Sequence, residues 1–197
     1  MRWQFAPWTA ALLTEAAPRP GERVLDQAAD TGTVVRRAAP FVGPSGRVIA
    51  FDVNPAMLAV GRSLPMPAGA LIEWLEGDGT RLPLPDAAFD LALCQQGLQY
   101  LPDRPAGLVE ARCVLAPGGR VVFAVWRSLA HDAVAASTNS TARRVLGSDA
   151  MVATFALGDP DELRRLFAGA GFAAVEPVPR ELTVVCPSRA ELVVRQG

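Results

Sequence analysis

The chain contains no lysine, a single histidine and three cysteines, and these shortages exclude several kinds of site. Without lysine there is no P-loop, because that phosphate-binding loop requires a lysine beside its glycines. The cysteines Cys94, Cys113 and Cys186 are far apart in the sequence and form no CxxC pair. We therefore expect neither a metal site nor a disulfide framework, and we interpret each cysteine as a buried apolar residue.

The charge balance offers no basic field for nucleic acid, because 20 acidic residues against 19 arginines give a formal net charge of −1. No apolar run approaches the roughly 20 residues that a membrane helix needs. The first 18 residues lack a convincing secretory cleavage pattern, since Glu15 interrupts a short apolar helix. We expect no nucleic-acid partner, no membrane span and a cytoplasmic location, and a homodimer is one option for the oligomeric state.

The composition is that of an ordinary globular protein, with 50% hydrophobic and 20% charged residues in 197. This length suits one domain with a sizeable core. We therefore expect a single domain over residues 1–197, which opens with an amphipathic helix within residues 1–18.

Residues 22–33, with the sequence ERVLDQAADTGT, are the stretch around which the chain is organised. A short buried strand ends at Asp26, a turn of small residues runs from Ala28 to Gly32, and a helix with apolar residues at helical spacing follows. A strand, a tight turn and a helix are typical of the start of a nucleotide-binding βαβ unit. The turn lets a ligand approach the backbone, and the helix N-terminus offers free N–H groups.

A second strand, residues 47–52, ends in Asp52, about 20 residues after Gly32. An acid at this place in such a unit can accept hydrogen bonds from ribose hydroxyls. The alternative is an aspartate that caps the next helix, which begins at Asn54 and Pro55. Given the preceding turn, we favour the ribose interpretation.

Strands continue to alternate with helices along the chain, and this order predicts a parallel sheet covered on both faces. Ligands of such sheets bind beyond the carboxyl ends of the strands, where Asp26, Asp52 and Asp78 would gather. Three further strands are expected, at residues 70–75, 89–95 and 120–126.

The C-terminal third is less regular. Residues 127–157 contain a helix, at 133–146, that is either part of a lid over the site or a plain surface helix. Another helix begins at Asp159 and Pro160 and stops at residues 169–171. Residues 172–178 and 182–186 alternate enough to pair as an antiparallel hairpin, and residues 188–197 begin a further helix.

Four stretches carry a family resemblance: VLDQAADTG, FDVNPAML, GDGTRLPLPDAAFDLALCQQGLQYLPD and VLAPGGRVVFAVW. With them the chain resembles the class I S-adenosylmethionine-dependent methyltransferases, in the group like the ubiquinone/menaquinone C-methyltransferases, over nearly its whole length. The resemblance implies an α/β fold with a doubly wound, mostly parallel seven-stranded sheet. It also implies helices on both faces and a C-terminal antiparallel hairpin.

The resemblance implies S-adenosylmethionine as the cofactor and assigns residues to it. Asp26 would lie near its methionine end, and the loop from Ala28 through Asp30 to Gly32 would touch it. Asp52 would bind the ribose hydroxyls.

Further residues would surround the adenine and the acceptor. Met57 would lie beside the adenine, Asp78 would accept from its amino group, and the Gly79 N–H would meet the ring. The backbone carbonyl of Gln95 would lie near the amino-acid end of the cofactor. The acceptor-side candidates are Gln96, Gly97, Tyr100 and Trp126.

Two residues depart from the family pattern. Asp30 stands where the first of two glycines is usual, and Gln27 stands where a small apolar residue is usual. Aspartate tolerates some of the backbone angles of glycine, but it adds bulk and a charge near the cofactor's carboxylate. Two like charges about 4 Å apart repel by roughly 4 kcal/mol at an effective dielectric near 20. Members of the group also usually continue past the helix expected near Glu191, so the acceptor pocket could be incomplete.

Methyl transfer from a sulfonium requires alignment of the reacting atoms and exclusion of water, and a base only where the acceptor must lose a proton. The catalytic residues are therefore unknown from the sequence. His131 is a candidate base because it follows the fifth strand, and the alternative is a surface histidine that opens a helix.

The functional prediction is methyl transfer from S-adenosylmethionine to a small, fairly apolar molecule. The alternative is a non-catalytic methyltransferase-like protein that acts as a binding or partner subunit. A dinucleotide oxidoreductase fits less well because the turn lacks G-x-G-x-x-G, and a serine hydrolase lacks the G-x-S-x-G turn. The identity of the acceptor stays open.

Overall fold

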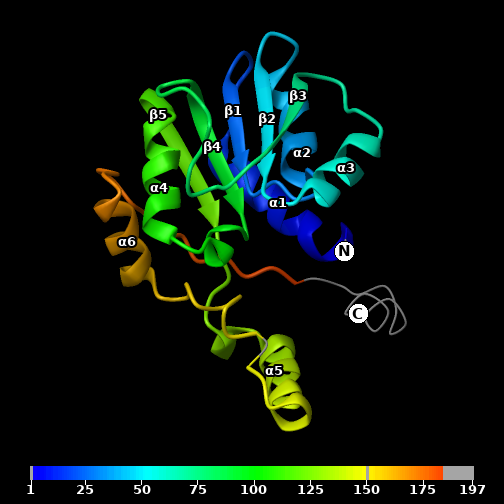
Figure 1. The fold of residues 1–197 in the computed structure, drawn as a ribbon, viewed down its shortest axis with the longest axis vertical. Coiled ribbons are helices and arrows are strands. Elements are labelled where there is room, and N and C mark those ends of the chain that lie inside the picture. Colours follow the sequence, from blue (N-terminus) through cyan, green and yellow to red (C-terminus); the bar gives the residue numbers. More distant parts are fainter. Residues whose placement is uncertain (1, 150, 184–197) are drawn as a thin grey trace.

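A computed structural model describes the backbone of residues 2–149 and 151–183 and side chains from residue 5 onward (Figure 1). Its centre is a five-stranded sheet with the order β3-β2-β1-β4-β5, in which every pair of neighbours is parallel. The order reverses direction between β1 and β4, and open sheets of this kind bind ligands outside that point. The strands are β1 (Arg23–Gln27), β2 (Arg47–Asp52), β3 (Leu71–Glu76), β4 (Phe89–Gln95) and β5 (Leu115–Ala124).

Helices cover both faces of this sheet, as the sequence predicts. On one face α1 (Arg2–Ala16), α2 (Thr33–Val42) and α3 (Pro55–Ser63) pack. On the other face lie α4 (Arg104–Cys113) and α6 (Pro160–Gly169) (Figure 1). The central strands are apolar on both sides because successive side chains alternate between two buried faces. In β1, for example, Val24 belongs to the core under α1 and α2, whereas Leu25 belongs to the opposite core.

The start of α3 confirms the predicted cap. Asn54 Oδ1 accepts from the backbone N–H groups of Ala56 (3.0 Å) and Met57 (3.3 Å), and Pro55 occupies the first helical position. Aspartates cap α4 and α6 in the same way, each followed by a proline in the first turn. These local signals fix where the three helices begin. At α3 they also fix the turn that follows β2.

The predicted seven-stranded sheet with a hairpin is wrong for the described residues, which form five parallel strands and no antiparallel pair. Residues 172–178 are irregular. Phe172 and Val175 pack on the core beside α4 and α6, and Pro177 and Pro179 have no N–H to donate to a ladder. Of the other predicted hairpin segment, residues 184–186 lie outside the described part, as does the helix expected at 188–197.

The fifth strand begins earlier than predicted. It starts at Leu115, pairs with β4 through an irregular register, and includes Gly118 at φ +79°. Residues 117–119, which precede the predicted strand, are therefore an irregularity within the observed one.

The segment 127–157 contains a short 3₁₀ turn, η2 (Leu129–His131), and α5 (Ala133–Leu146). Figure 1 shows α5 apart from the sheet, on the side where the strands end. Its role as a lid stays a prediction. None of the helices in residues 2–149 and 151–183 is long and apolar enough to cross a membrane.

Candidate active site

The carboxyl ends of β1, β2 and β4 bring three polar side chains to the same face of the sheet. Asp26 is in register with Ala50 of β2 and with Leu93 of β4. Because every second residue of a strand shares a face, Asp52 and Gln95, each two residues further along, lie on the face of Asp26. This is the face that α1 and α2 cover. The predicted gathering of acids extends along the same edge to Asp78, which follows β3.

Asp26 is a buried acid without a hydrogen-bond partner in the described structure. Its exposed fraction is 1%, and neither carboxylate oxygen accepts a hydrogen bond. Burial raises its pKa well above the ordinary value, and the negative charges of Asp52 and Asp30 raise it further. Gln95 Oε1 is also buried without a donor. Buried polar atoms are nearly always hydrogen-bonded, so these oxygens point to a ligand that brings N–H or O–H groups.

The loop after β1 takes an unusual path that aspartate can follow. Ala28, Asp30 and Gly32 have positive φ angles of 68°, 53° and 78°. Asp30 thus takes a left-handed conformation, which Asp and Asn adopt more readily than most residues. Its backbone N–H donates to Asp52 Oδ2 at 2.8 Å, and the N–H of Asn54 donates to Asp52 Oδ1 at 2.8 Å. Asp52 therefore holds the loop and the turn after β2 together.

The carboxyl group of Asp30 is influenced by the same neighbours. Partial burial and the charge of Asp52 raise its pKa, while a hydrogen bond from the backbone N–H of Thr31 opposes that rise. Asp30 and Asp52 thus add negative charge beside the buried Asp26.

Trp74 of β3 fixes the loop against α3, a role that sequence reasoning missed. A Cβ atom on Gly32 would overlap the Trp74 ring, and so would a Cβ atom on Gly61 of α3. Only glycine therefore fits at these two contacts. Because α3 carries Met57, which is 40% exposed, Trp74 also sets the position of that side chain relative to the loop.

Gln27, the second unusual residue, connects three elements on the opposite face. It is fully buried, and its Nε2 donates to the carbonyl oxygens of Gly79 (2.6 Å) and Gly107 (3.3 Å). It therefore ties the end of β1 to the loop that carries Asp78 and to α4. Sequence reasoning noted this glutamine as a departure but did not find its partners.

Asp78 lies on the surface of that loop. Its Oδ1 accepts from the backbone N–H and the hydroxyl group of Thr80, each at 2.8 Å, and these bonds lower its pKa. They leave the second carboxylate oxygen for a ligand. Gly79, the next residue, is buried.

Gln96 and Tyr100, from the predicted acceptor side, follow β4. Gln96 has a φ of 59°, its N–H donates to Ala124 of β5 at 2.8 Å, and its Oε1 accepts from Gln99 at 3.0 Å. Tyr100 is 59% exposed, and its hydroxyl oxygen lies 2.9 Å from Thr154 Oγ1. Tyr100 thus connects the site edge to the segment 151–157.

Trp126 is the centre of an aromatic cluster, which we define as Phe5, Trp8, Trp126 and Phe155. The Trp126 ring meets Trp8 edge-on at 5.4 Å, stacks on Phe155 at 6.0 Å and lies 6.4 Å from Phe5. The cluster joins α1, the chain after β5 and the segment 151–157 in one apolar surface.

His131, the candidate base, is exposed in η2. Its Nε2 lies 2.7 Å from the Arg127 guanidinium, and its Nδ1 lies 3.0 Å from Ser128 Oγ. Arg127 therefore occupies the nitrogen that a base would use. A catalytic role for His131 stays a prediction that this geometry does not favour.

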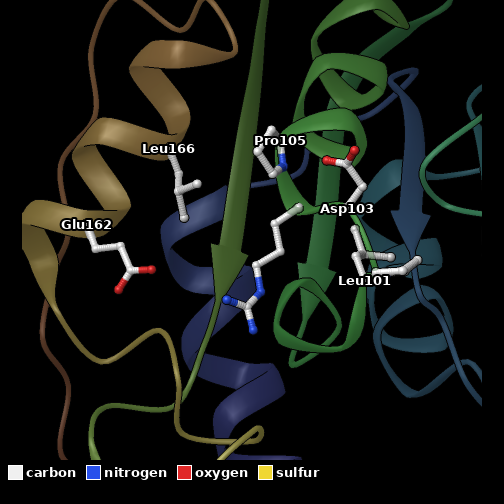
Figure 2. A pocket seen from close by; sticks show the side chains of 7 residues that line it. Leu101, Asp103, Pro105, Glu162 and Leu166 are labelled. Carbon is white, nitrogen blue, oxygen red and sulfur yellow. The ribbon is translucent and has the colours of Figure 1, made fainter.

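A shallow cavity of about 330 Å³ lies elsewhere, between the start of α4 and α6. Figure 2 shows Glu162 and Leu166 on one wall and Leu101, Asp103 and Pro105 on the other. None of the predicted site residues lines it. The cavity is therefore separate from the acids at the strand ends.

Residues 3–143 match the model of the ubiE/COQ5 methyltransferase family. The ubiquinone/menaquinone biosynthesis C-methyltransferase UbiE of Burkholderia mallei is 38% identical over 126 residues, which are 62% of this chain and 52% of that protein. The chain thus spans about half the length of the curated relatives it matches.

Solved structures share the fold. A protein from Bacillus halodurans described as a methyltransferase superposes with a TM-score of 0.65 and 25% identity, over 85% of this chain and 70% of its own. The arsenic(III) S-adenosylmethionine methyltransferase of Chlamydomonas reinhardtii superposes with a TM-score of 0.59 and 28% identity, over 79% of this chain and 53% of its own.

Proposed function

Because the chain belongs to the ubiE/COQ5 methyltransferase family, we propose that it transfers a methyl group from S-adenosylmethionine to a small, fairly apolar molecule. The match covers the sheet, the loop after β1 and most of α5. The acids at the carboxyl ends of three neighbouring strands, Asp26, Asp52 and Asp78, are the residues on which the proposal depends.

The observation that carries the proposal is the buried, unpartnered carboxyl group of Asp26. The methionine part of the cofactor has an ammonium group, which supplies both N–H donors and positive charge. These are what Asp26 and the orphaned Gln95 oxygen lack, so the residues present fit this group. A neutral ligand without donors would leave both Asp26 oxygens and the Gln95 oxygen unsatisfied.

The other residues fit the rest of the cofactor. The Asp52 oxygens each accept one backbone N–H and have lone pairs left for ribose hydroxyls. Met57 offers an apolar surface for the adenine, and Asp78 keeps one oxygen for an amino group. In this proposal the cofactor-binding residues are Asp26, Ala28, Asp30, Gly32, Asp52, Met57, Asp78, Gly79 and Gln95.

The chain's own contribution to catalysis is to position the reactants and to exclude water. When bound, the cofactor supplies an electrophilic methyl group on a sulfonium. The aromatic cluster, Gln96 and Tyr100 then offer an apolar surface with few polar groups for the acceptor. No base is required unless the acceptor has a proton to lose.

The alternative, a non-catalytic binding or partner subunit, was suggested by Asp30. The left-handed conformation of Asp30 and its bond to Asp52 show that the loop accommodates this residue. No observation favours the alternative over the enzyme. The cytoplasmic location and the homodimer stay predictions.

The proposal is tested by incubating the purified chain with methyl-labelled S-adenosylmethionine and a panel of small apolar acceptors. The panel begins with substituted quinols, because the curated relatives are named for ubiquinone and menaquinone biosynthesis. Label in the organic extract that disappears in Asp26→Ala supports an enzyme. A folded chain that neither binds S-adenosylmethionine nor labels any acceptor would support the partner-subunit alternative.

A further inference from the structure

We propose that Asp30 makes this site select the positively charged methyl donor over its neutral product, S-adenosylhomocysteine. The inference rests on the proposed function and goes beyond it, because it gives a role to a residue that departs from the family pattern. The ratio of the product Kd to the donor Kd would then be larger than with a glycine at position 30.

The backbone of Asp30 is held in place by Asp52. Its N–H donates to Asp52 Oδ2 at 2.8 Å, and the other oxygen of Asp52 is held by the N–H of Asn54 at 2.8 Å. Its φ of 53° lies in the left-handed region. Ala28 and Gly32, on either side of it in the loop, have the same left-handed conformation. The Asp30 carboxyl group therefore belongs to the same turn that presents backbone N–H groups at the start of α2.

No cationic side chain of the described protein pairs with the acids there. Asp30 and Asp52 both act electrostatically on Asp26, whose two oxygens are buried and without partners. In residues 2–149 and 151–183, none of these three aspartates takes part in an ion pair. Nor do the described acids, histidine and cysteines form a group that could hold a metal ion. The site therefore has an excess of negative charge that an organic cation would relieve.

The two ligands differ in charge at the sulfur atom. Donor and product share the adenine, the ribose, the ammonium and the carboxylate. They differ in the methyl group and in the positive charge of the sulfonium, which the product lacks. Contacts to the shared groups cancel in the ratio of the two dissociation constants. The repulsion expected between Asp30 and the cofactor's carboxylate cancels as well, whereas the attraction between Asp30 and the sulfonium does not.

The test is calorimetric titration of the whole chain with S-adenosylmethionine and with S-adenosylhomocysteine at pH 8. The variants are Asp30→Asn, which removes the charge at nearly constant shape, and Asp30→Gly, which restores the usual residue. Asp161→Asn, on α6 at the other face, is the matched control. Thermal unfolding of each variant confirms that it is folded.

We expect the ratio of the product Kd to the donor Kd to fall about tenfold in both Asp30 variants, as an interaction of charges several ångströms apart predicts. Asp161→Asn leaves the ratio unchanged. If both ligands bind and the ratio does not change in the Asp30 variants, the inference is overturned and the proposed function stands. If neither ligand binds to the chain or to any variant, the proposed function fails and the inference fails with it.

Discussion

The backbone N–H of Asp30 donates to Oδ2 of Asp52 across 2.8 Å, and this bond joins the loop after β1 to the end of β2. Asp52 therefore fixes the loop, and in the proposed function its remaining lone pairs accept from a ribose.

Replacing Asp52 by alanine removes the acceptor for the N–H groups of both Asp30 and Asn54. We expect the Kd for S-adenosylmethionine to rise at least about tenfold, because a charge-assisted hydrogen bond contributes roughly 1.5–3 kcal/mol. Calorimetric titration measures the change. Asp52→Asn, which keeps one oxygen acceptor, should lie between the wild type and Asp52→Ala, and wild-type affinity in Asp52→Ala would exclude the assigned role.

Gln27→Leu removes the donor to the Gly79 and Gly107 carbonyl groups at nearly constant volume. The free energy of unfolding should fall by about 1–3 kcal/mol, because two buried acceptors lose their partner. Urea denaturation gives the value. Leu25→Met, in the same strand and on the same face, is the control and should cost under about 1.5 kcal/mol. Equal stability of Gln27→Leu and the wild type would show that the bridge is not needed.

Gly61→Ala places a methyl group where the Trp74 ring lies. The ring is packed against α2 and the sheet, so we expect a loss of about 1–3 kcal/mol in the free energy of unfolding. In a double-mutant cycle Trp74→Leu should remove most of the added cost of the alanine. If the two substitutions are additive, the contact does not set the position of α3.

Two groups of acids make stability depend on pH in opposite directions. The pKa of Asp26 is raised by burial and by its acidic neighbours, so its contribution to stability is lost as pH rises through the raised value. The pKa values of Asp90 and Glu73 are lowered by their arginine partners, so their contributions are lost as pH falls. These pairs are partly exposed, and we expect about 1 kcal/mol or less from each.

The Asp26 contribution is isolated by comparing the wild type with Asp26→Asn between pH 4.5 and 8. The free energy of unfolding of the wild type should decline relative to that of the variant as pH rises, because only the wild type must bury a charge. Parallel curves would mean that Asp26 titrates normally in the folded chain.

The sequence predicted the elements that depend on local signals. The five parallel strands, the cap at Asn54 and the acids at the strand ends follow from short apolar runs, turn residues and capping chemistry. For Asp52 the sequence offered ribose binding or a capping role. The structure shows that it holds the Asn54 N–H while Asn54 itself caps α3, so the ribose role stays available.

The parts that could not be predicted depend on long-range contacts. Gln27 meets Gly79 and Gly107 at separations of 52 and 80 residues, and no local pattern specifies such partners. The contacts of Trp74 with Gly32 and Gly61 also join distant parts of the sequence, so no local pattern specifies them. The hairpin prediction failed at residues 172–178 because alternating apolar residues do not reveal whether a partner strand is present.

The central claim, that the acids at the strand ends bind S-adenosylmethionine, is tested most directly by calorimetric titration of the wild-type chain and Asp26→Asn. The account predicts binding in the micromolar range by the wild type and a Kd at least about tenfold higher in the variant, since the variant loses a charge-assisted contact to the ammonium group. A folded wild-type chain that takes up no S-adenosylmethionine, or a variant that binds it equally well, would contradict the account.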